Sequence, residues 1–281
     1  MDISDSVFNL LLDFVRKKAG IFLPVSKKLF VISKIKERAR ELGFDSVEDY
    51  IRYAVKKDNL RENFKLISLL TVGKTDFFRE YEHYKLLYSK ILPYFFSKRK
   101  LLRIWSIGCS SGEEPYSISI LIEEYINNSI NKDIDYYILA TDINLKSIEK
   151  AREGIYSVSD LENVPLDILK KYFLFEGKTS EEFYRVREKI KRKINFKVDN
   201  IIDSKVYDLF DIIFLKNVMM YFSVDDRQRV IDKVYDSLEY DGFLFIGLSE
   251  SIDDLKYKLK RFFVKVYQKF IWGLLWMSWL F

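Results

Sequence analysis

A glycine-rich turn that carries two glutamates has the residue types of a ligand-binding site. The stretch IWSIGCSSGEEPYS (104–117) runs an apolar strand into Gly108 and Gly112, and a helix then starts at Glu113 and Glu114. Such a turn brings the backbone close to a ligand, and the helix N-terminus normally attracts phosphate. Two glutamates at that end stabilise the helix dipole but repel phosphate. The turn therefore predicts a neutral or cationic ligand.

A carboxylate follows the next apolar strand. Asp142 ends YYILATD (136–142), a position where an acidic residue accepts the hydroxyls of a ribose. Ribose without phosphates, together with a positive centre, describes S-adenosylmethionine. Each residue also has a simpler explanation, because the glutamates can serve as N-terminal helix charges and Asp142 can cap the following helix. Their order on successive strand ends favours an S-adenosylmethionine site.

The composition excludes several other kinds of site. The 281 residues carry a net charge of +5, which is too weak by itself to indicate a nucleic-acid-binding protein. Cys109 is the single cysteine, so an internal disulfide and multi-cysteine metal sites are excluded. His83 is the single histidine, which excludes histidine-cluster metal sites and argues against a Ser-His-Asp triad. We therefore expect no metal site.

The two ends of the sequence give an expectation about location. The first residues, MDISDSVFNLLLDFV, lack the basic segment and cleavage site of a signal peptide, so we expect a cytoplasmic protein. The apolar tail 270–281 (FIWGLLWMSWLF) carries no charge, but a membrane span needs about 20 apolar residues. We expect no stable membrane insertion. Docking on the fold or a partner, an interfacial anchor and a sequence-end artefact all remain open for this tail.

Helical periodicity covers the first 80 residues. Apolar residues recur at helical spacing from Val7 to Val15, and Gly20 ends that helix. Further helices are expected in 26–44, 46–55 and 60–71. We assign residues 1–80 to an N-terminal all-helical domain that docks on a partner.

From residue 81 to residue 269 apolar strands alternate with helices. This pattern is typical of an α/β fold with a doubly wound, mostly parallel sheet, which binds its ligand at the carboxyl ends of the strands. Gly108, Asp142, Asn200 and Asn217 follow four of these strands, so we expect them to lie together. The strands are expected in 101–107, 136–142, 195–200, 210–217 and 242–247, with a final strand in 262–268. The segment of about 172–196 breaks the alternation and predicts an inserted β-hairpin subdomain.

Seven stretches of the chain together have the pattern of a known protein family. They are LLTVGKTDFFRE (69–80), WSIGCSSGEEPYSISI (105–120), ATDIN (140–144), KAREGIYS (150–157), VDNII (198–202), FDIIFLKNVMMYF (210–222) and GFLFIGLSES (242–251). In this order they resemble the CheR family of chemotaxis receptor methyltransferases, which are protein-glutamate O-methyltransferases. The resemblance spans nearly the whole chain up to residue 269, and GEEPYS and NVMMYF are its most specific motifs. It implies a class I methyltransferase with a Rossmann-like fold, which turns S-adenosylmethionine into S-adenosylhomocysteine.

The resemblance also implies a role for each matching residue. Arg79 and Tyr221 are its candidate catalytic residues, Arg79 near the methionine carboxylate or the reacting centre and Tyr221 near the transferring methyl. Tyr221 has a simpler explanation as a core residue under the following helix. The cofactor-binding residues that the resemblance implies are Gly73, Thr75, Arg79, Gly108, Glu114, Asp142, Asn200, Ile201, Asn217 and Val218.

Four positions depart from the family pattern. The family usually has Asn where this chain has Gly73, Arg where it has Lys216, His where it has Leu248 and often Arg where it has Phe175. Lysine keeps the positive charge of arginine but loses its planar fork of donors. We still expect an active enzyme.

The implied reaction needs little acid-base chemistry. A glutamate side chain has a pKa near 4.3, so it is already ionised at neutral pH. Its attack on a sulfonium methyl is then a displacement whose rate depends on proximity and orientation. We expect Arg79 and Tyr221 to hold the substrate carboxylate.

A basic segment indicates the partner. Residues 26–40 contain Lys and Arg at six positions against the single acidic residue Glu37, and Lys27, Lys34 and Arg38 can share one helical face. A solvated surface helix is the alternative. The resemblance implies that a monomer, recruited to membrane receptor arrays, docks this helix on the acidic helical cytoplasmic domain of methyl-accepting chemotaxis receptors. It also implies that the hairpin near 183–186 is where some members bind a receptor C-terminal peptide.

Two other functions remain open. A nucleic-acid methyltransferase would share the cofactor fold, but it predicts a broad basic face that the sequence does not indicate. A non-catalytic module that binds the cofactor or the receptor is favoured most by Gly73, Lys216 and Leu248. Titration with S-adenosylmethionine and an assay of receptor methylation distinguish these functions.

Overall fold

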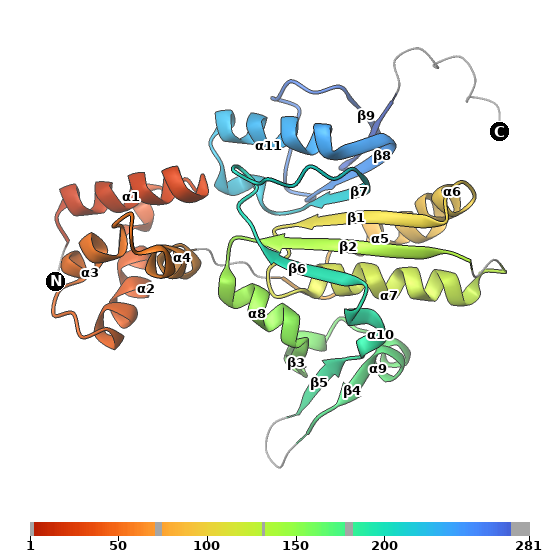
Figure 1. Ribbon diagram of the computed structural model, residues 1–281, viewed down its shortest axis with the longest axis horizontal. Coiled ribbons are helices and arrows are strands. Elements are labelled where there is room, and N and C mark those ends of the chain that lie inside the picture. Colours follow the sequence, from red (N-terminus) through yellow and green to blue (C-terminus); the bar gives the residue numbers. More distant parts are fainter. Residues whose placement is uncertain (1–2, 71–74, 131–132, 178–181, 271–281) are drawn as a thin grey trace.

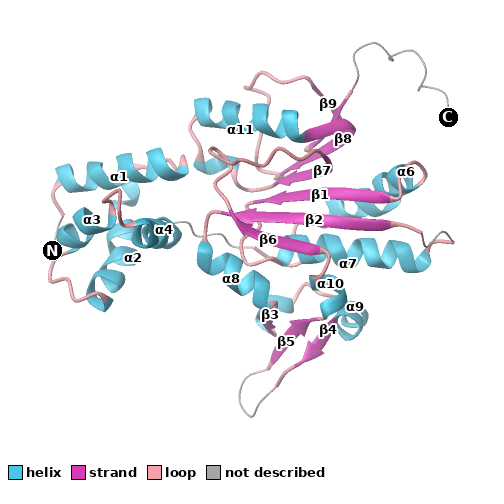
Figure 2. Cartoon of the chain, in the orientation of Figure 1, coloured by secondary structure: helices cyan, strands magenta, loops and turns pink. Residues whose placement is uncertain are grey.

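The computed structural model describes residues 3–70, 75–130, 133–177 and 182–270 of the chain. In these residues a group of helices precedes a seven-stranded sheet with helices on both faces, and a small second sheet lies beside it (Figures 1 and 2). The doubly wound α/β class predicted from the alternating pattern is confirmed. Two features of the sequence fall outside the described residues, namely Gly73 and the apolar tail beyond Phe270.

The described N-terminal residues form four α-helices, where the periodicity predicts them. The first helix ends at Gly20, whose φ of +68° is left-handed, and the third begins after Ser46, whose hydroxyl accepts the N–H of Glu48 at 3.1 Å. The apolar faces of the four helices meet in one core. Their bounds are α1 (Asp5–Ala19), α2 (Lys28–Glu41), α3 (Val47–Ala54) and α4 (Leu60–Leu70).

The main sheet has the strand order β6-β2-β1-β7-β8-β10-β9, and its first five strands are parallel. The order changes direction between β1 and β7, which is where sheets of this kind bind ligands. The carboxyl ends of β1 and β2 point toward the N-terminal helices (Figure 1). The parallel strands are β1 (Leu101–Ile107), β2 (Asp135–Asp142), β6 (Ile194–Val198), β7 (Phe210–Leu215) and β8 (Leu238–Ile246).

Two hydrophobic cores lie on the two faces of this sheet. Alternate residues of β1 supply them, because Leu102 and Ile104 pack in one core while Trp105 and Ile107 pack in the other. The helices that cover the faces are α5 (Tyr81–Leu86), which continues through a π-helical turn (Leu87–Ile91) into α6 (Leu92–Phe96), α7 (Glu113–Asn128), α8 (Leu145–Glu153) and α11 (Val224–Ser237).

The prediction of a single final strand in 262–268 is wrong. The structure has an antiparallel hairpin there, made of β9 (Leu259–Phe263) and β10 (Val266–Lys269). The chain turns at Lys265, whose φ of +56° is left-handed. Apolar residues continue on both sides of this turn and neither Gly nor Pro marks it, so the sequence pattern gives no turn signal.

The inserted subdomain contains the predicted hairpin and one further strand. The hairpin consists of β4 (Phe173–Phe175) and β5 (Phe183–Val186), and β3 (Ile155–Ser157), which follows α8, pairs with the other side of β5. Helices α9 (Leu166–Tyr172) and α10 (Glu188–Lys191) flank it.

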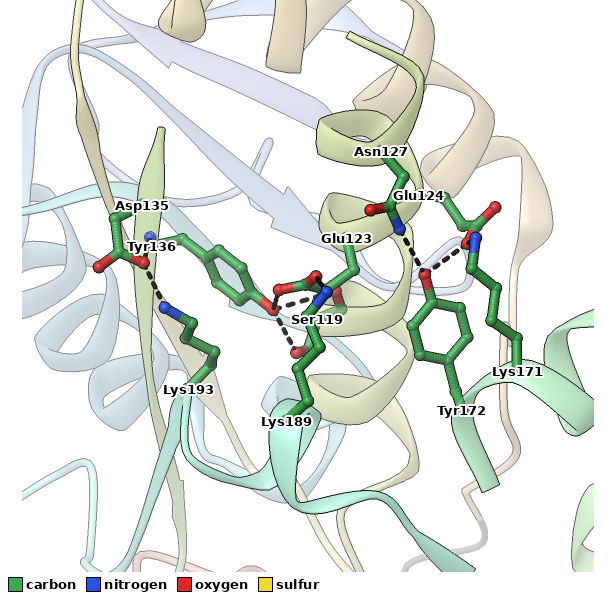
Figure 3. Close-up of polar contacts among 10 residues, drawn as sticks. All are labelled: Ser119, Glu123, Glu124, Asn127, Asp135, Tyr136, Lys171, Tyr172, Lys189 and Lys193. Atoms are coloured by element: carbon green, nitrogen blue, oxygen red, sulfur yellow. Dashed lines mark hydrogen bonds and ion pairs between the residues drawn. The ribbon is translucent and has the colours of Figure 1, made fainter. Parts of the chain in front are cut away.

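Polar contacts tie this subdomain to α7 (Figure 3). Glu124 of α7 accepts hydrogen bonds from the Tyr172 hydroxyl and, at 2.5 Å, from Lys171. Glu123, one residue earlier, pairs with Lys189 at 2.5 Å and accepts a hydrogen bond from the Tyr136 hydroxyl at 3.0 Å. Helix α7, which begins at the glycine-rich turn, is thus fixed toward its other end to β2 of the main sheet and to helices α9 and α10 of the subdomain.

Candidate functional site

A cleft lies at the carboxyl ends of the parallel strands. It encloses about 730 Å³, counting its open mouth, and it brings together the ends of β1, β2, β6 and β7. Seven of the predicted site residues line it: Gly108, Asp142, Asn200, Ile201, Asn217, Val218 and Tyr221. Residues that sequence reasoning did not select also line it: Ala19, Ile21, Ile107, Ser110, Thr141, Ile143, Asn144, Ser147, Asp199 and Phe222.

Gly108 forms the floor of the cleft, directly after β1. Its φ is +71°, and a Cβ atom at this position would lie 2.3 Å from Cγ2 of Val218. Both the backbone conformation and the space therefore require glycine. The residue gives a bound molecule direct access to the backbone at the strand end.

Asp142 is held by peptide groups. Its two carboxylate oxygens accept the N–H of Ser110 at 2.8 Å and the N–H of Asn144 at 2.7 Å. Burial raises the pKa of this carboxyl, while these backbone hydrogen bonds act to lower it. A carboxylate oxygen has more than one acceptor site, so an oriented Asp142 can also accept hydroxyl groups of a ligand in the cleft.

Two buried polar atoms beside the cleft have no hydrogen-bond partner within the described part of the chain. They are Nδ2 of Asn217, a donor, and Oδ2 of Asp199, an acceptor. A buried polar atom without a partner costs free energy, so unpaired groups of this kind are candidates for contacts with a ligand. Asn217 has a φ of +59°, a conformation that asparagine tolerates better than most residues.

A second carboxylate fixes the loop that carries Asn217. Glu250 accepts the N–H of Asn217 at 2.7 Å, of Met219 at 2.8 Å and of Gly247 at 2.9 Å. Burial raises the pKa of Glu250 although backbone hydrogen bonds act to lower it. Glu250 lies in a stretch that carries the family resemblance, but its role was not among the predictions.

The end of helix α1 forms one wall of the cleft. Ala19 and Ile21 line the cavity, and the carbonyl of Lys18 accepts a hydrogen bond from Nδ2 of Asn200 at 2.8 Å. Ile21 pairs with Phe222 as an isolated antiparallel bridge. Helical periodicity predicts α1 itself, but no sequence signal indicates that its end packs against a strand end almost two hundred residues later.

A buried charge network lies behind the turn, next to the cleft. Lys216, at the end of β7, lies 3.3 Å from Oε2 of Glu80 and 3.4 Å from Oε2 of Glu114, and it donates to the carbonyl of Arg79 at 3.2 Å. Glu114 also accepts the Ser106 hydroxyl at 2.8 Å. One lysine therefore connects the glycine-rich turn with the segment between the two domains.

Glu80 is the most strongly bound member of this network. Burial acts to raise its pKa, but contacts with His83, Lys216 and the N–H of Leu248 outweigh burial and lower that pKa to about 2. The Leu248 N–H donates to Oε1 of Glu80 at 3.0 Å, and Nδ1 of His83 lies 3.5 Å from Oε2. Glu80 is thus ionised at neutral pH.

Glu113 has a different environment from its neighbour. Its carboxylate accepts the Ser111 hydroxyl at 2.8 Å and lies almost fully buried. Burial raises its pKa to about 7, although the Ser111 hydroxyl and a backbone hydrogen bond act to lower it. The two glutamates of the turn therefore differ, because Glu114 faces Lys216 whereas Glu113 has no ion pair among the described residues.

Three of the predicted cofactor-binding residues that the structure describes, Glu114, Thr75 and Arg79, do not line the cavity. Glu114 lies in the charge network just behind it, Thr75 lies in the interdomain segment, and Gly73 falls outside the described residues. The side chain of Arg79 is exposed, and its carbonyl is the atom that contacts Lys216. The roles implied for these residues stay predictions.

The predicted docking residues of α2 have different surroundings. Lys27 and Lys34 are exposed. Arg38 instead makes two hydrogen bonds to the buried Glu62 at 2.9 Å and one to Glu41 at 2.8 Å, so its charge already has partners inside the helical region. None of the described helices is long and apolar enough to cross a membrane, and in the described residues no His, Cys, Asp and Glu side chains cluster as a metal site.

Comparison with known proteins places the chain in a family. Residues 73–268 match the model described as CheR methyltransferase, SAM binding domain, and residues 6–71 match CheR methyltransferase, all-alpha domain. The chain is 35% identical over 260 residues to a chemotaxis protein methyltransferase of Borreliella burgdorferi, with 90% of each chain covered. It is 31% identical over 259 residues to that of Escherichia coli, with 90% and 87% covered. The chain belongs to the CheR methyltransferase family, and its cofactor is S-adenosylmethionine.

The cleft fits this cofactor. Asp142 offers a carboxylate to ribose hydroxyls, and the unpaired Oδ2 of Asp199 offers an acceptor for an amino group. The apolar side chains of Ile143 and Ile201 suit a flat heterocycle, and Gly108 leaves room for a chain against the backbone. Among the residues that the structure describes, no lysine or arginine lines the cavity, which agrees with a ligand that has no phosphate.

Proposed function

We propose that this protein transfers a methyl group from S-adenosylmethionine to glutamate side chains of chemotaxis receptors, forming glutamate methyl esters. The family membership supports methyl transfer. The observation that supports a glutamate substrate is the position of Tyr221, which lines the cofactor cleft at its junction with a helical domain whose exposed surface is basic. A glutamate carboxylate on an acidic receptor helix could contact Tyr221, and the acidic helix could dock on the basic residues of the helical domain.

The residues of the cleft would bind S-adenosylmethionine and align its methyl group with the substrate. When bound, S-adenosylmethionine supplies an electrophilic methyl group on a positively charged sulfur. Asp142 and Asp199 would hold the adenosine part, and Asn217 and Val218 would line the part nearer the reacting atoms. Lys216 pairs with both Glu80 and Glu114, so its single positive charge offsets part of the negative charge beside the cleft.

No general base is required for this reaction. A substrate glutamate with an ordinary pKa near 4.3 is ionised at neutral pH. We expect the Tyr221 hydroxyl and the Arg79 guanidinium to hold the substrate carboxylate, and the rate to depend on this alignment. Replacement of either residue should lower kcat more than cofactor affinity, and an unchanged kcat would remove that residue from the mechanism.

Exposed lysines on α2 would attract the receptor. Lys27 and Lys34 fit docking on an acidic helical domain, whereas Arg38 contributes mainly by holding Glu62 within the helical region. Attraction between exposed charges weakens with salt. We therefore expect receptor affinity to fall between 50 mM and 300 mM salt, on the order of tenfold, and a flat response would contradict this docking mode.

Transfer of radiolabelled methyl from S-adenosylmethionine to receptor-rich membranes tests the proposal. We expect label that is released by mild alkali, as methyl esters are, and its loss in Asp142→Ala. Label that resists alkali would indicate another acceptor and overturn the proposal.

The same assay tests the alternative of a non-catalytic module. The observation that favours this alternative is Lys216, which stands in the charge network where the family has arginine. Cofactor binding without any transfer to receptors would support the module. Cofactor binding together with alkali-labile label would exclude it.

A further inference from the structure

The loop after α1 and the first turn of α2 expose four large apolar side chains. Phe22 is 59% exposed, Val25 65%, Leu29 76% and Phe30 46%. The opposite face of α2 is buried in the core of the helical region, so these residues are not part of that core. Neighbouring exposed apolar residues of this size mark interaction surfaces. We call these four residues the apolar ridge.

The ridge starts at the mouth of the cofactor cleft. Ile21 lines the cleft, and the next residue, Phe22, donates its N–H to the carbonyl of Tyr221 at 2.7 Å. The bridge between Ile21 and Phe222 holds the two segments together. The first ridge residue is therefore fixed to the backbone of the candidate catalytic tyrosine.

Cations surround the ridge. Lys27, Lys34, Lys36 and Arg40 are exposed on the same helix or directly before it, and the Lys34 ammonium lies 5.7 Å from the centre of the Phe30 ring. Leu29 and Phe30 lie in the first turn of α2, and Val25 begins the short 3-10 turn (Val25–Lys27) that leads directly into this helix. The surface thus combines the apolar ridge with lysine and arginine side chains. It complements a partner helix that carries acidic and apolar residues on one face.

We propose that the apolar ridge selects which glutamate is methylated. The partner is an acidic helix with an apolar side chain on the same face as the acceptor glutamate, one or two helical turns away. That side chain packs on Leu29 and Val25 while the glutamate reaches the cleft beside Tyr221. The inference rests on the proposed function and adds a rule for substrate choice, since charge attracts any acidic helix but the ridge distinguishes among its glutamates.

A pair of acceptors tests the rule. The probe is a soluble helical-bundle receptor fragment with one methylatable glutamate, made in two versions with Leu or Ser four residues from it. We expect the wild-type protein to methylate the Leu version with a kcat/KM roughly tenfold higher, the size expected for burying one such side chain. Leu29→Gln should remove this preference and leave binding of S-adenosylhomocysteine unchanged.

A matched variant controls for surface hydrophobicity. Leu166 begins α9, far from the ridge in Figure 1, and it is 72% exposed, close to the value for Leu29. Leu166→Gln should keep the tenfold preference. Val25→Gln supplies a second ridge variant, and we expect it to reduce the preference as well.

Several results would overturn the inference. They are equal rates on the two versions, an equal loss on both versions in Leu29→Gln, or no transfer to either version by a protein that labels receptor-rich membranes. If Leu29→Gln abolished only self-association, the ridge would bind a second copy of the protein instead. If it abolished only binding to receptor-free anionic vesicles, the ridge would bind a membrane surface instead. No label on receptor-rich membranes would instead contradict the proposed function.

Discussion

Two kinds of carboxylate, all of them at least partly buried, lie at the same end of the sheet. Asp142 and Glu250 are held mainly by peptide N–H groups, at 2.7–2.9 Å. Glu80 and Glu114 both depend on the ammonium of Lys216, at 3.3 and 3.4 Å. The first kind orients the loops of the cofactor cleft, and the second connects the glycine-rich turn to the interdomain segment.

This difference shows where the site tolerates change in sequence. A peptide N–H is present whatever side chain the residue carries, so contacts of the first kind survive most substitutions of the donor residue. Leu248 illustrates this, because its backbone N–H donates to Glu80 although the family usually has histidine at that position. Lys216 makes its contacts with Glu80 and Glu114 through its side chain. Having lysine there instead of the family's usual arginine therefore changes the group that makes these contacts.

Removal of the Lys216 ammonium should have the largest effect. Lys216→Met leaves the partly buried Glu80 and Glu114 without their cation, and we expect a loss of unfolding free energy near the lower end of the about 3–5 kcal/mol that breaking a fully buried ion pair costs. Denaturant unfolding measures this cost. Lys216→Arg should stay close to the wild type. The exposed pair of Lys85 with Glu82 is the control, and Lys85→Met should leave the unfolding free energy close to the wild-type value.

Removal of the Asp142 carboxylate should reduce the affinity for the cofactor. Asp142→Ala removes the acceptor for ribose hydroxyls, and the loss of charge-assisted hydrogen bonds should weaken S-adenosylhomocysteine binding roughly 100-fold. Isothermal titration calorimetry measures the affinity. Thermal unfolding without ligand shows whether the loops of Ser110 and Asn144 remain in place. Unchanged affinity in a folded variant would contradict the assignment of Asp142.

Glu113 sharpens the comparison because its carboxylate is buried without an ion pair among the described residues, and the Ser111 hydroxyl is its side-chain partner. Its pKa of about 7 in the folded state lies above the ordinary value of 4.5, so the folded state binds the proton more tightly than the unfolded state does. Stability contributed by this residue therefore falls as pH rises from 5 to 7, by roughly 2 kcal/mol. Glu113→Gln should flatten this part of the pH–stability profile, measured by urea unfolding. An identical slope in the variant would show that Glu113 is not the group responsible.

The smallest effect is expected at Asn217. Asn217→Gly keeps the left-handed backbone but removes the unpaired Nδ2 donor, and we expect cofactor affinity to fall roughly fivefold, the value of one neutral hydrogen bond. Asn217→Ala adds backbone strain of about 1 kcal/mol to this loss. Affinities and unfolding free energies of the two variants separate the side-chain effect from the backbone effect. Equal cofactor affinity for Asn217→Gly and wild type would mean that Nδ2 does not contact the cofactor.

Much of the fold could be predicted from the sequence because local signals were strong. The apolar run 101–107 lies between polar or glycine residues, and β1 has those bounds. Gly20 and Ser46 marked a helix end and a helix start, and the structure has a left-handed cap at one and a side-chain cap at the other. The final hairpin was missed because its turn at Lys265 lacks a turn residue. β3 was missed because three residues after a helix are too few to show a period.

The candidate site could be predicted where a residue follows a strand. Gly108, Asp142 and Asn217 occupy such places, and the parallel sheet brings them into one cleft. Contacts between distant segments gave no local pattern, which is why Ala19 and Ile21 were not predicted as a wall of the cleft. The partner of Arg38 was missed for the same reason, because Glu62 lies on another helix of the same domain.

The wall formed by the end of α1 makes the two domains thermodynamically dependent on each other. Residues of both domains line one cavity, and beside it the Asn200 amide donates to the Lys18 carbonyl. Any partner whose binding to the helices displaces the end of α1 must change the affinity for the cofactor. Linkage then requires the cofactor to change the affinity for that partner by the same factor. For such a partner, its release and the exchange of S-adenosylhomocysteine for S-adenosylmethionine would be coupled events.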